Sequence, residues 1–307
     1  MKTSTRTSSR DPVRGDQVQQ VGGPAAVADQ AGGLGAWIAR SGRRTEDGRP
    51  PGKRGIAGVA RRYPIVSFVV LACVFGWAPY IAAYVGLGSN PGNLPLGPLV
   101  AALIVTACQG RAELRTWLRQ LRSWRAPPRW YLLAVLAPAA LHFFNVLVNH
   151  ALGAPLPTWE QLAGLPAAVA SLVVFVALVG VGEEAGWTAF VAPILLRRHG
   201  LLVAWVIASV MRICWHLPLM ISGDLPWVIG TVGNAAFTMV VLQVFTASGG
   251  RWTPMAVWHA SLNAFGGAFF FQMVTGQDKA RLGYLLAAAY TVVATITYFA
   301  ARHRKRT

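Results

Sequence analysis

Charge is scarce in this sequence. Of the 307 residues, 13% carry a charge and 54% are hydrophobic, whereas soluble chains have about 25% charged residues. No Asp, Glu, Lys or Arg occurs between Arg62 and Arg111, a gap that leaves room for two membrane crossings of roughly 20 residues each. The shortage of charge excludes a soluble enzyme and a disordered scaffold, and it indicates a lipid environment.

Cysteine is also rare, and no spacing pairs one cysteine with another. Cys73, Cys108 and Cys214 each stand alone in an apolar segment, which excludes a disulfide framework and a zinc knuckle. The first 60 residues contain no apolar run, so we expect no signal peptide.

The charges that are present are mostly positive and unevenly placed. The formal net charge is +17, residues 1–62 hold 12 Lys and Arg, and most of the others flank apolar segments. This placement is typical of membrane proteins, whose cytoplasmic loops are enriched in Lys and Arg. We therefore expect contacts with membrane lipids and no nucleic-acid partner.

Apolar stretches follow one another from Tyr63 onward and predict an all-α, polytopic membrane helix bundle with about eight transmembrane helices. The crossings are placed near residues 64–87, 95–109, 130–150, 165–190, 201–220, 226–246, 254–274 and 282–301. With both termini in the cytoplasm, the cytoplasmic segments would hold 25 of the 28 Lys and Arg, as the positive-inside rule requires. The prediction is a multi-pass protein of the cell membrane. It has a disordered basic cytoplasmic tail (1–60), a membrane domain (61–302) and a basic C-terminal tail (303–307).

The segment between the second and third crossings has an amphipathic pattern. One helical face carries leucine and tryptophan, while the arginines lie mostly elsewhere. The apolar face consists of Leu114, Trp117, Leu118, Leu121 and Trp124. The pattern predicts an interfacial helix on the cytoplasmic leaflet, with its arginines facing lipid phosphates.

Ionisable residues inside the crossings are the candidates for function, because a charge at the bilayer centre costs roughly 2.5–3.5 kcal/mol on insertion scales. They are Glu183, Glu184, Arg212, His142, His216 and His259. The two adjacent glutamates project about 100° apart on a helix and cannot share a face. His259 and Asn263 are four residues apart and do share one. For His142 and Asn234 we expect interhelical hydrogen bonds first and a place in the lining of the substrate cavity second.

Two glutamates, two histidines and an asparagine on three crossings fit hydrolytic chemistry. A carboxylate can act as the base, imidazoles as acids or ligands, and an amide as an oxyanion donor. A glutamate with two histidines is also a catalytic zinc set. The sequence has no H-E-x-x-H and no G-x-S-x-G motif, and its only aspartates after the tail, Asp224 and Asp278, lie in predicted loops. We expect the hydrolytic site below the cytoplasmic surface.

These residues resemble the motifs of the CPBP intramembrane proteases, the family of CAAX prenyl proteases, bacteriocin-processing enzymes and Abi-type proteins. The family pattern is E-E-x-x-x-R, then F-x-x-x-H, then H-x-x-x-N or D, on three crossings. The chain offers Glu183-Glu184, then His216 in Trp-His-Leu-Pro, then His259-x-x-x-Asn263. The resemblance covers roughly residues 110–275 and makes the membrane domain an intramembrane protease domain.

The resemblance implies an endopeptidase that acts on a hydrophobic or lipid-modified peptide. Glu183 would activate the hydrolytic water, with Glu184 beside it, and Asn263 would hold the oxyanion. His216 and His259 would be acid–base partners or, together with Glu183, ligands of a zinc ion. The resemblance leaves open whether zinc is used.

Two positions depart from the family pattern. Thr188 stands where the first motif has arginine, and Arg212 stands where the second has phenylalanine. Because one arginine is lost and one is gained at sites that can face each other, we predict an Arg212–Glu184 ion pair, with Glu183 nearer the histidines than Glu184. Three alternatives stay open: an inactive family member acting as an immunity or partner-binding protein, a bis-histidine haem protein, and a transporter.

Overall fold

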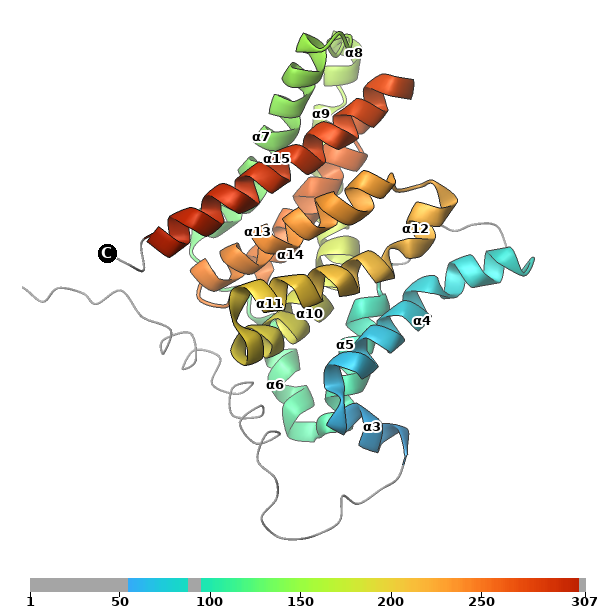
Figure 1. The fold of residues 1–307 in the computed structure, drawn as a ribbon, viewed down its shortest axis with the longest axis vertical. Helices are drawn as coiled ribbons and strands as arrows, with labels where there is room; N and C mark the ends of the chain where they lie inside the picture. Colours follow the sequence, from blue (N-terminus) through green and yellow to red (C-terminus); the bar gives the residue numbers. More distant parts are fainter. Residues whose placement is uncertain (1–54, 88–94, 304–307) are drawn as a thin grey trace, which may run out of the picture.

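The computed structural model of the chain describes residues 55–87 and 95–303 (Figure 1). All regular elements in these two ranges are helices, which confirms the all-α prediction. Among the residues described, five helical stretches are long and apolar enough to cross a membrane, so the chain is a multi-pass membrane protein. They are Pro64–Tyr84 (α4), Pro128–Ala151 (α7), Trp159–Trp215 (α8 to α11), Ile229–Ala247 (η3 and α13) and Gly276–His303 (α15).

Eight separate crossings are not shown. The second predicted crossing is a short apolar helix of 13 residues, α5 (Gly97–Gln109). The seventh is divided between α14 (Thr253–Ser261) and a π-helical turn, η4 (Leu262–Gly267). The fourth and fifth lie within the single stretch Trp159–Trp215, which has 57 residues.

That long stretch nevertheless folds back on itself. Within α11 (Ala192–Trp215), Gly200 has φ 70° and ψ 178°, a left-handed backbone that glycine adopts at little cost. Glu184 and Arg212 are 28 residues apart, or about 42 Å in a straight helix, yet Nη2 of Arg212 lies 2.7 Å from Glu184. The chain therefore reverses between the two residues, at Gly200.

The remainder of this stretch alternates between α-helical and π-helical segments. After α8 (Trp159–Leu162) come α9 (Leu165–Phe175), η1 (Val176–Val181), α10 (Gly182–Gly186) and η2 (Trp187–Val191). Two glycines set how closely this stretch packs: a Cβ on Gly180 would lie 2.5 Å from the Ala256 carbonyl oxygen, and a Cβ on Gly186 2.5 Å from that of Pro98. The helix that carries the glutamates is thus held against α14 on one side and α5 on the other.

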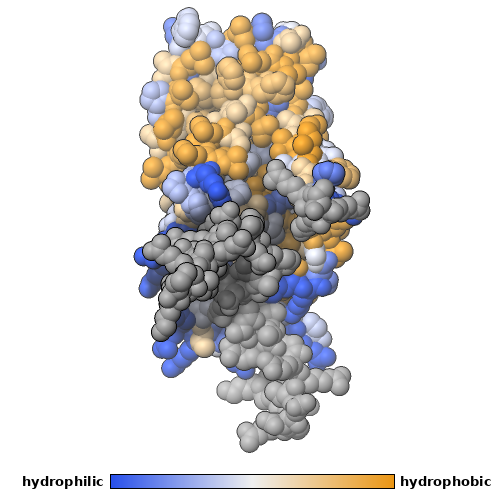
Figure 2. All heavy atoms as spheres, turned by 90° about the vertical axis from the view of Figure 1, so that its left-hand side faces the viewer, coloured by the Kyte–Doolittle hydropathy of each residue, from blue (hydrophilic) through white to orange (hydrophobic). Residues whose placement is uncertain are grey.

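A helix, α6 (Arg111–Arg122), is present where the sequence predicts an interfacial one. Trp117 is fully buried, and the three leucines of the predicted face pack against the core, as does Trp124 on Trp252 with 5.6 Å between ring centroids. The arginines of α6 are exposed. Figure 2 shows hydrophilic side chains gathered at this lower end of the molecule and a broad apolar band above it.

A short helix, α3 (Ile56–Arg62), precedes α4, so residues 56–60 of the predicted tail are helical. Arg61 Nε donates to the Cys108 carbonyl oxygen at 2.6 Å, which ties α3 to the end of α5. Most of the predicted N-terminal tail (1–54) and residues 304–307 of the C-terminal tail lie outside the described residues.

Candidate active site

Glu184 is the hub of the polar core. Its side chain is fully buried, and Nη2 of Arg212 donates to both of its oxygens, at 2.7 Å each. Thr188 Oγ1 donates to Oε2, and His259 Nδ1 lies 2.9 Å from Oε1. The carboxylate therefore links α10 to η2, α11 and α14, and the predicted Arg212–Glu184 ion pair is confirmed.

The two departures from the family motif meet at this carboxylate. Thr188, at the position of the motif arginine, supplies a hydroxyl group to the carboxylate. Arg212 supplies the positive charge from the part of α11 that follows the reversal at Gly200. The Arg212 guanidinium also lies 5.4 Å from the Trp187 ring centroid and 5.5 Å from that of Phe237, within cation–π range. Two aromatic faces and one carboxylate thus stabilise a cation that is 2% exposed.

Glu183 has a different environment although it is adjacent in sequence. It is 4% exposed, and its Oε2 makes no hydrogen bond with any described residue. That oxygen lies 4.0 Å from His259 Nδ1, compared with 2.9 Å for Glu184. The prediction that Glu183 is nearer the histidines is therefore wrong for His259. The 100° step between neighbours turns Glu184 toward α11 and α14 and Glu183 into a cavity.

The cavity has a volume of ≈ 740 Å³, and four predicted site residues line it together. They are Glu183, His216, His259 and Asn263. Glu184, Arg212 and Thr188 do not line the cavity. They lie behind the residues that do. The predicted convergence of the three motifs on one cavity is confirmed.

His216, at the C-terminal end of α11, is oriented by the backbone of its own helix. Its Nδ1 lies 2.8 Å from the Arg212 carbonyl oxygen and 3.1 Å from Asn234 Nδ2. A protonated Nδ1 donates to the carbonyl oxygen, whereas an unprotonated Nδ1 accepts from the Asn234 amide, so the tautomer decides which of the two bonds forms. Asn234, for which cavity lining was the second expectation, is a cavity residue beside this histidine.

His259 and Asn263 lie one helical turn apart at the junction of α14 and η4. Nδ1 of His259 faces the Glu184 carboxylate, which leaves Nε2 as the nitrogen able to accept a proton. Asn263 Nδ2 donates to the His259 carbonyl oxygen at 3.0 Å. An amide group has two N–H donors, so Asn263 keeps one for another acceptor.

His142 lines the cavity, the second of its two expected roles, and does not make the interhelical hydrogen bond expected first. It is 1% exposed, and neither of its ring nitrogens makes a hydrogen bond with the residues described. Phe270 and Phe271 pack on its ring at centroid distances of 6.3 and 6.2 Å. A Cβ on Gly266 would come 2.5 Å from the ring, so this glycine makes room for it.

The described side chains do not form the three-ligand zinc set that the sequence left open. Within 55–87 and 95–303, no group of three or more His, Cys, Asp or Glu is placed to hold a metal. His259 turns Nδ1 to a carboxylate that Arg212 already neutralises, and His216 turns Nδ1 to a backbone carbonyl. Nδ1 of each histidine thus makes a hydrogen bond that fixes its ring, and Nε2 of each is free of these bonds.

These features define an integral membrane site in which a buried ion pair supports a second carboxylate at a cavity. Residues 165–265 match the family model of type II CAAX prenyl endopeptidase Rce1-like proteins. This segment, which contains all the motif residues, is thus a domain of the Rce1-like type II CAAX prenyl endopeptidase (CPBP) family, and the predicted resemblance is confirmed. No curated protein and no solved structure matches the chain.

Proposed function

We propose that the protein is an intramembrane endopeptidase that hydrolyses a peptide bond with a water activated by Glu183. The observation that carries this proposal is the contrast between the two adjacent carboxylates. Glu184 is fully engaged with Arg212, Thr188 and His259, whereas Glu183 presents an unpaired oxygen at the cavity. A buried carboxylate without a partner is costly unless a bound molecule satisfies it.

In this reaction the Glu183 carboxylate takes a proton from a water in the cavity, and the hydroxide attacks the scissile carbonyl. The free N–H of Asn263 hydrogen-bonds the oxyanion that forms. The proton then passes to the leaving amine as the C–N bond breaks, with Nε2 of His216 or His259 as a relay. Arg212, Thr188 and Glu184 act as positioning residues because they hold His259 and the backbone that carries Glu183.

The proposal includes the finer features of the predicted architecture. The chain reverses at Gly200, and both α5 and the α14–η4 pair are short apolar helical segments. Eight passes are therefore consistent with the helices described. Residues 61–302 are the protease domain, and both termini are cytoplasmic. The substrate is a hydrophobic or lipid-modified peptide.

The Arg212–Glu184 pair favours an active enzyme over an inactive family member. The feature that suggested inactivity was the missing motif arginine at position 188. Arg212 supplies a guanidinium to the same carboxylate.

A cleavage assay with membrane peptides tests the proposal. Glu183→Gln keeps the size of the side chain but removes the base, and it is compared with Glu160→Gln, a change at an exposed glutamate on α8. Cleavage by the wild type and by Glu160→Gln, together with its loss in Glu183→Gln, is the expected result. Equal cleavage by all three variants contradicts the role of Glu183.

A further inference from the structure

The exposed part of the cavity wall lies in two connections between helices. The first joins α12 (Leu217–Ser222) to η3 (Ile229–Gly233), and the second joins η4 to the start of α15. The lining residues that are exposed are Gly223, Asp224, Pro226, Gly267, Gln272, Gly276, Lys279 and Ala280. These residues form the mouth of the cavity.

The mouth lies at the opposite end of the bundle from the arginines. Helix α15 has 28 residues and runs from the mouth, at Lys279, to Arg302, over about 35 Å. Helix α13 (Asn234–Ala247) likewise leads away from the mouth to the turn that carries Arg251. In Figure 1, α12 and the start of α15 lie away from α3, α6 and the C-terminal end of α15.

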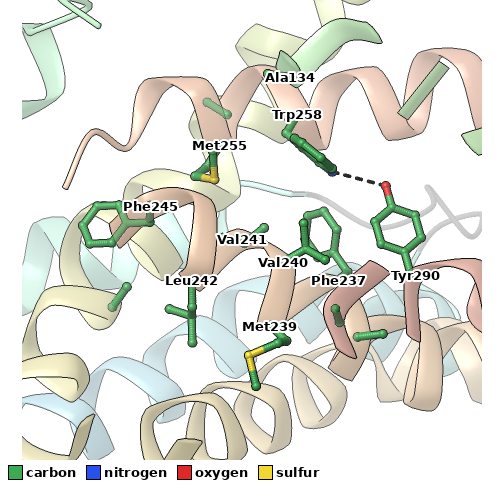
Figure 3. Close-up of a cluster of buried hydrophobic side chains, with 14 of the residues drawn as sticks. Ala134, Phe237, Met239, Val240, Val241, Leu242, Phe245, Met255, Trp258 and Tyr290 are labelled. Carbon is green, nitrogen blue, oxygen red and sulfur yellow. Dashed lines mark hydrogen bonds between the residues drawn. The ribbon is translucent and has the colours of Figure 1, made fainter. Parts of the chain in front are cut away.

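The opposite end of the cavity is closed by packed apolar side chains. Phe237, Leu286 and Tyr290 line the cavity and also belong to a buried cluster that continues through Met255 to Trp252. In this cluster, drawn in Figure 3, Trp258 Nε1 donates to the Tyr290 hydroxyl at 3.2 Å and links α14 to α15. A substrate therefore cannot reach Glu183 from the arginine-rich end without disrupting the core.

The distribution of charge assigns a side of the membrane to each end. Of the 15 Lys and Arg that the structure describes, 12 lie in segments at the arginine-rich end, Arg212 lies inside the bundle, and Lys279 and Arg281 lie at the mouth. The charge of Arg281 is in addition offset by Asp278, whose Oδ1 lies 2.6 Å from Nη2 of the arginine. Because Lys and Arg accumulate on the cytoplasmic side, the mouth faces the other side. The expectation of a site below the cytoplasmic surface does not agree with this geometry.

We infer that the cavity receives its substrate from the non-cytoplasmic face of the membrane, and this inference rests on the function proposed above. The substrate class is then a membrane-anchored peptide with an apolar segment exposed at that face. Apolar residues line the way in, Leu219, Leu225, Pro226, Ile229 and Phe271 among them, and suit an extended apolar chain. A lipidated tail presented in the cytoplasm meets the closed end.

Cysteine labelling in intact cells tests the side of access. Cys73, Cys108 and Cys214 are first replaced by alanine, and a single cysteine is then introduced as Ala280→Cys at the mouth. The matched control is Ala112→Cys, an exposed alanine on α6 at the arginine-rich end. A membrane-impermeant maleimide should label Ala280→Cys in intact cells, and Ala112→Cys only after permeabilisation. The reverse pattern overturns the inference.

A second readout links the mouth to the substrate. Prior reaction of Ala280→Cys with a bulky maleimide from outside should lower cleavage at least tenfold, whereas reaction of Ala112→Cys in permeabilised cells should leave it unchanged. Unchanged cleavage after complete labelling of Ala280→Cys overturns the inference. Since the labelling itself needs no catalysis, a loss of the proposed activity and a wrong side of access are distinguishable.

Discussion

Arg212 and Glu184 form an ion pair across the reversal at Gly200, with one guanidinium nitrogen 2.7 Å from each carboxylate oxygen. Both side chains are almost completely buried, so neither charge can be solvated by water if the other is removed. The pair thus holds the two arms of the hairpin in register, and it also fixes the carboxylate that faces His259.

Removal of one partner should therefore cost more than removal of both. Arg212→Leu and Glu184→Leu should each destabilise the protein by about 3–5 kcal/mol, because each leaves a buried charge unpaired. The double variant should recover much of that loss, although His259 still lacks its partner. Unfolding in detergent measures all four proteins, and strictly additive losses would show that the two side chains do not interact.

The two adjacent glutamates should separate activity from stability. Glu183→Gln should lower cleavage by roughly 10²–10⁴-fold because it removes a general base, while the midpoint of thermal unfolding stays near that of the wild type. Glu184→Gln should lower the midpoint because Arg212 loses its counter-charge. Measured side by side, a stable but inactive Glu184→Gln with an unstable Glu183→Gln would reverse the assignment.

Asn263 should affect the chemical step more than substrate binding. Asn263→Ala removes the free N–H donor and should lower kcat by about 10²–10³-fold, the usual cost of one oxyanion donor, with a small change in KM. Asn149→Ala is a suitable control, since Asn149 receives a hydrogen bond from Arg281 at 2.6 Å and does not line the cavity. A change confined to KM would assign Asn263 to substrate binding instead.

Cleavage should not depend on a metal ion. No group of three or more His, Cys, Asp or Glu among the described residues is placed to bind a metal. Treatment with a strong zinc chelator should leave the cleavage rate unchanged. An activity that is lost on chelation and restored by zinc alone would contradict this prediction and support the zinc set.

The buried arginine that pairs with Glu184 should function from position 188 as well as from position 212. Thr188→Arg alone should destabilise the protein, because it buries a second guanidinium beside one carboxylate. Combined with Arg212→Phe, the same change restores both family motifs and should recover stability and cleavage. Unfolding and cleavage assays on the two single variants and the double variant provide the comparison. A double variant less stable than either single one would show that the backbone is adapted to Arg212.

The sequence predicts much of this site, because charged residues in apolar segments are few. Glu184 and Arg212 are charges of opposite sign at a similar depth in the membrane. Because burying either charge alone is costly, the two are expected to pair. The spacing also shows that Glu183 and Glu184 point in different directions. It does not show which one meets His259, because that depends on how far α10 is rotated against α14.

The remaining differences arise from packing that no local pattern encodes. A hydropathy profile gives α14 and η4 the length of one crossing, although the helix proper ends at Ser261. Asn234 and His142 become cavity residues only because η3 and α7 pack beside the site. Likewise, the direction in which the cavity opens depends on where the apolar cluster around Phe237 fills the bundle.

The carboxylate of Glu184 requires a guanidinium but does not dictate which helix supplies it. A search pattern that demands arginine four residues after the second glutamate would reject this chain and class it as degenerate. A pattern that scores positions 188 and 212 jointly, and accepts one arginine at either, would retain it. Chains that carry the exchange in either direction would then be recognised as having a complete charge complement, and their inactivity would need evidence of its own.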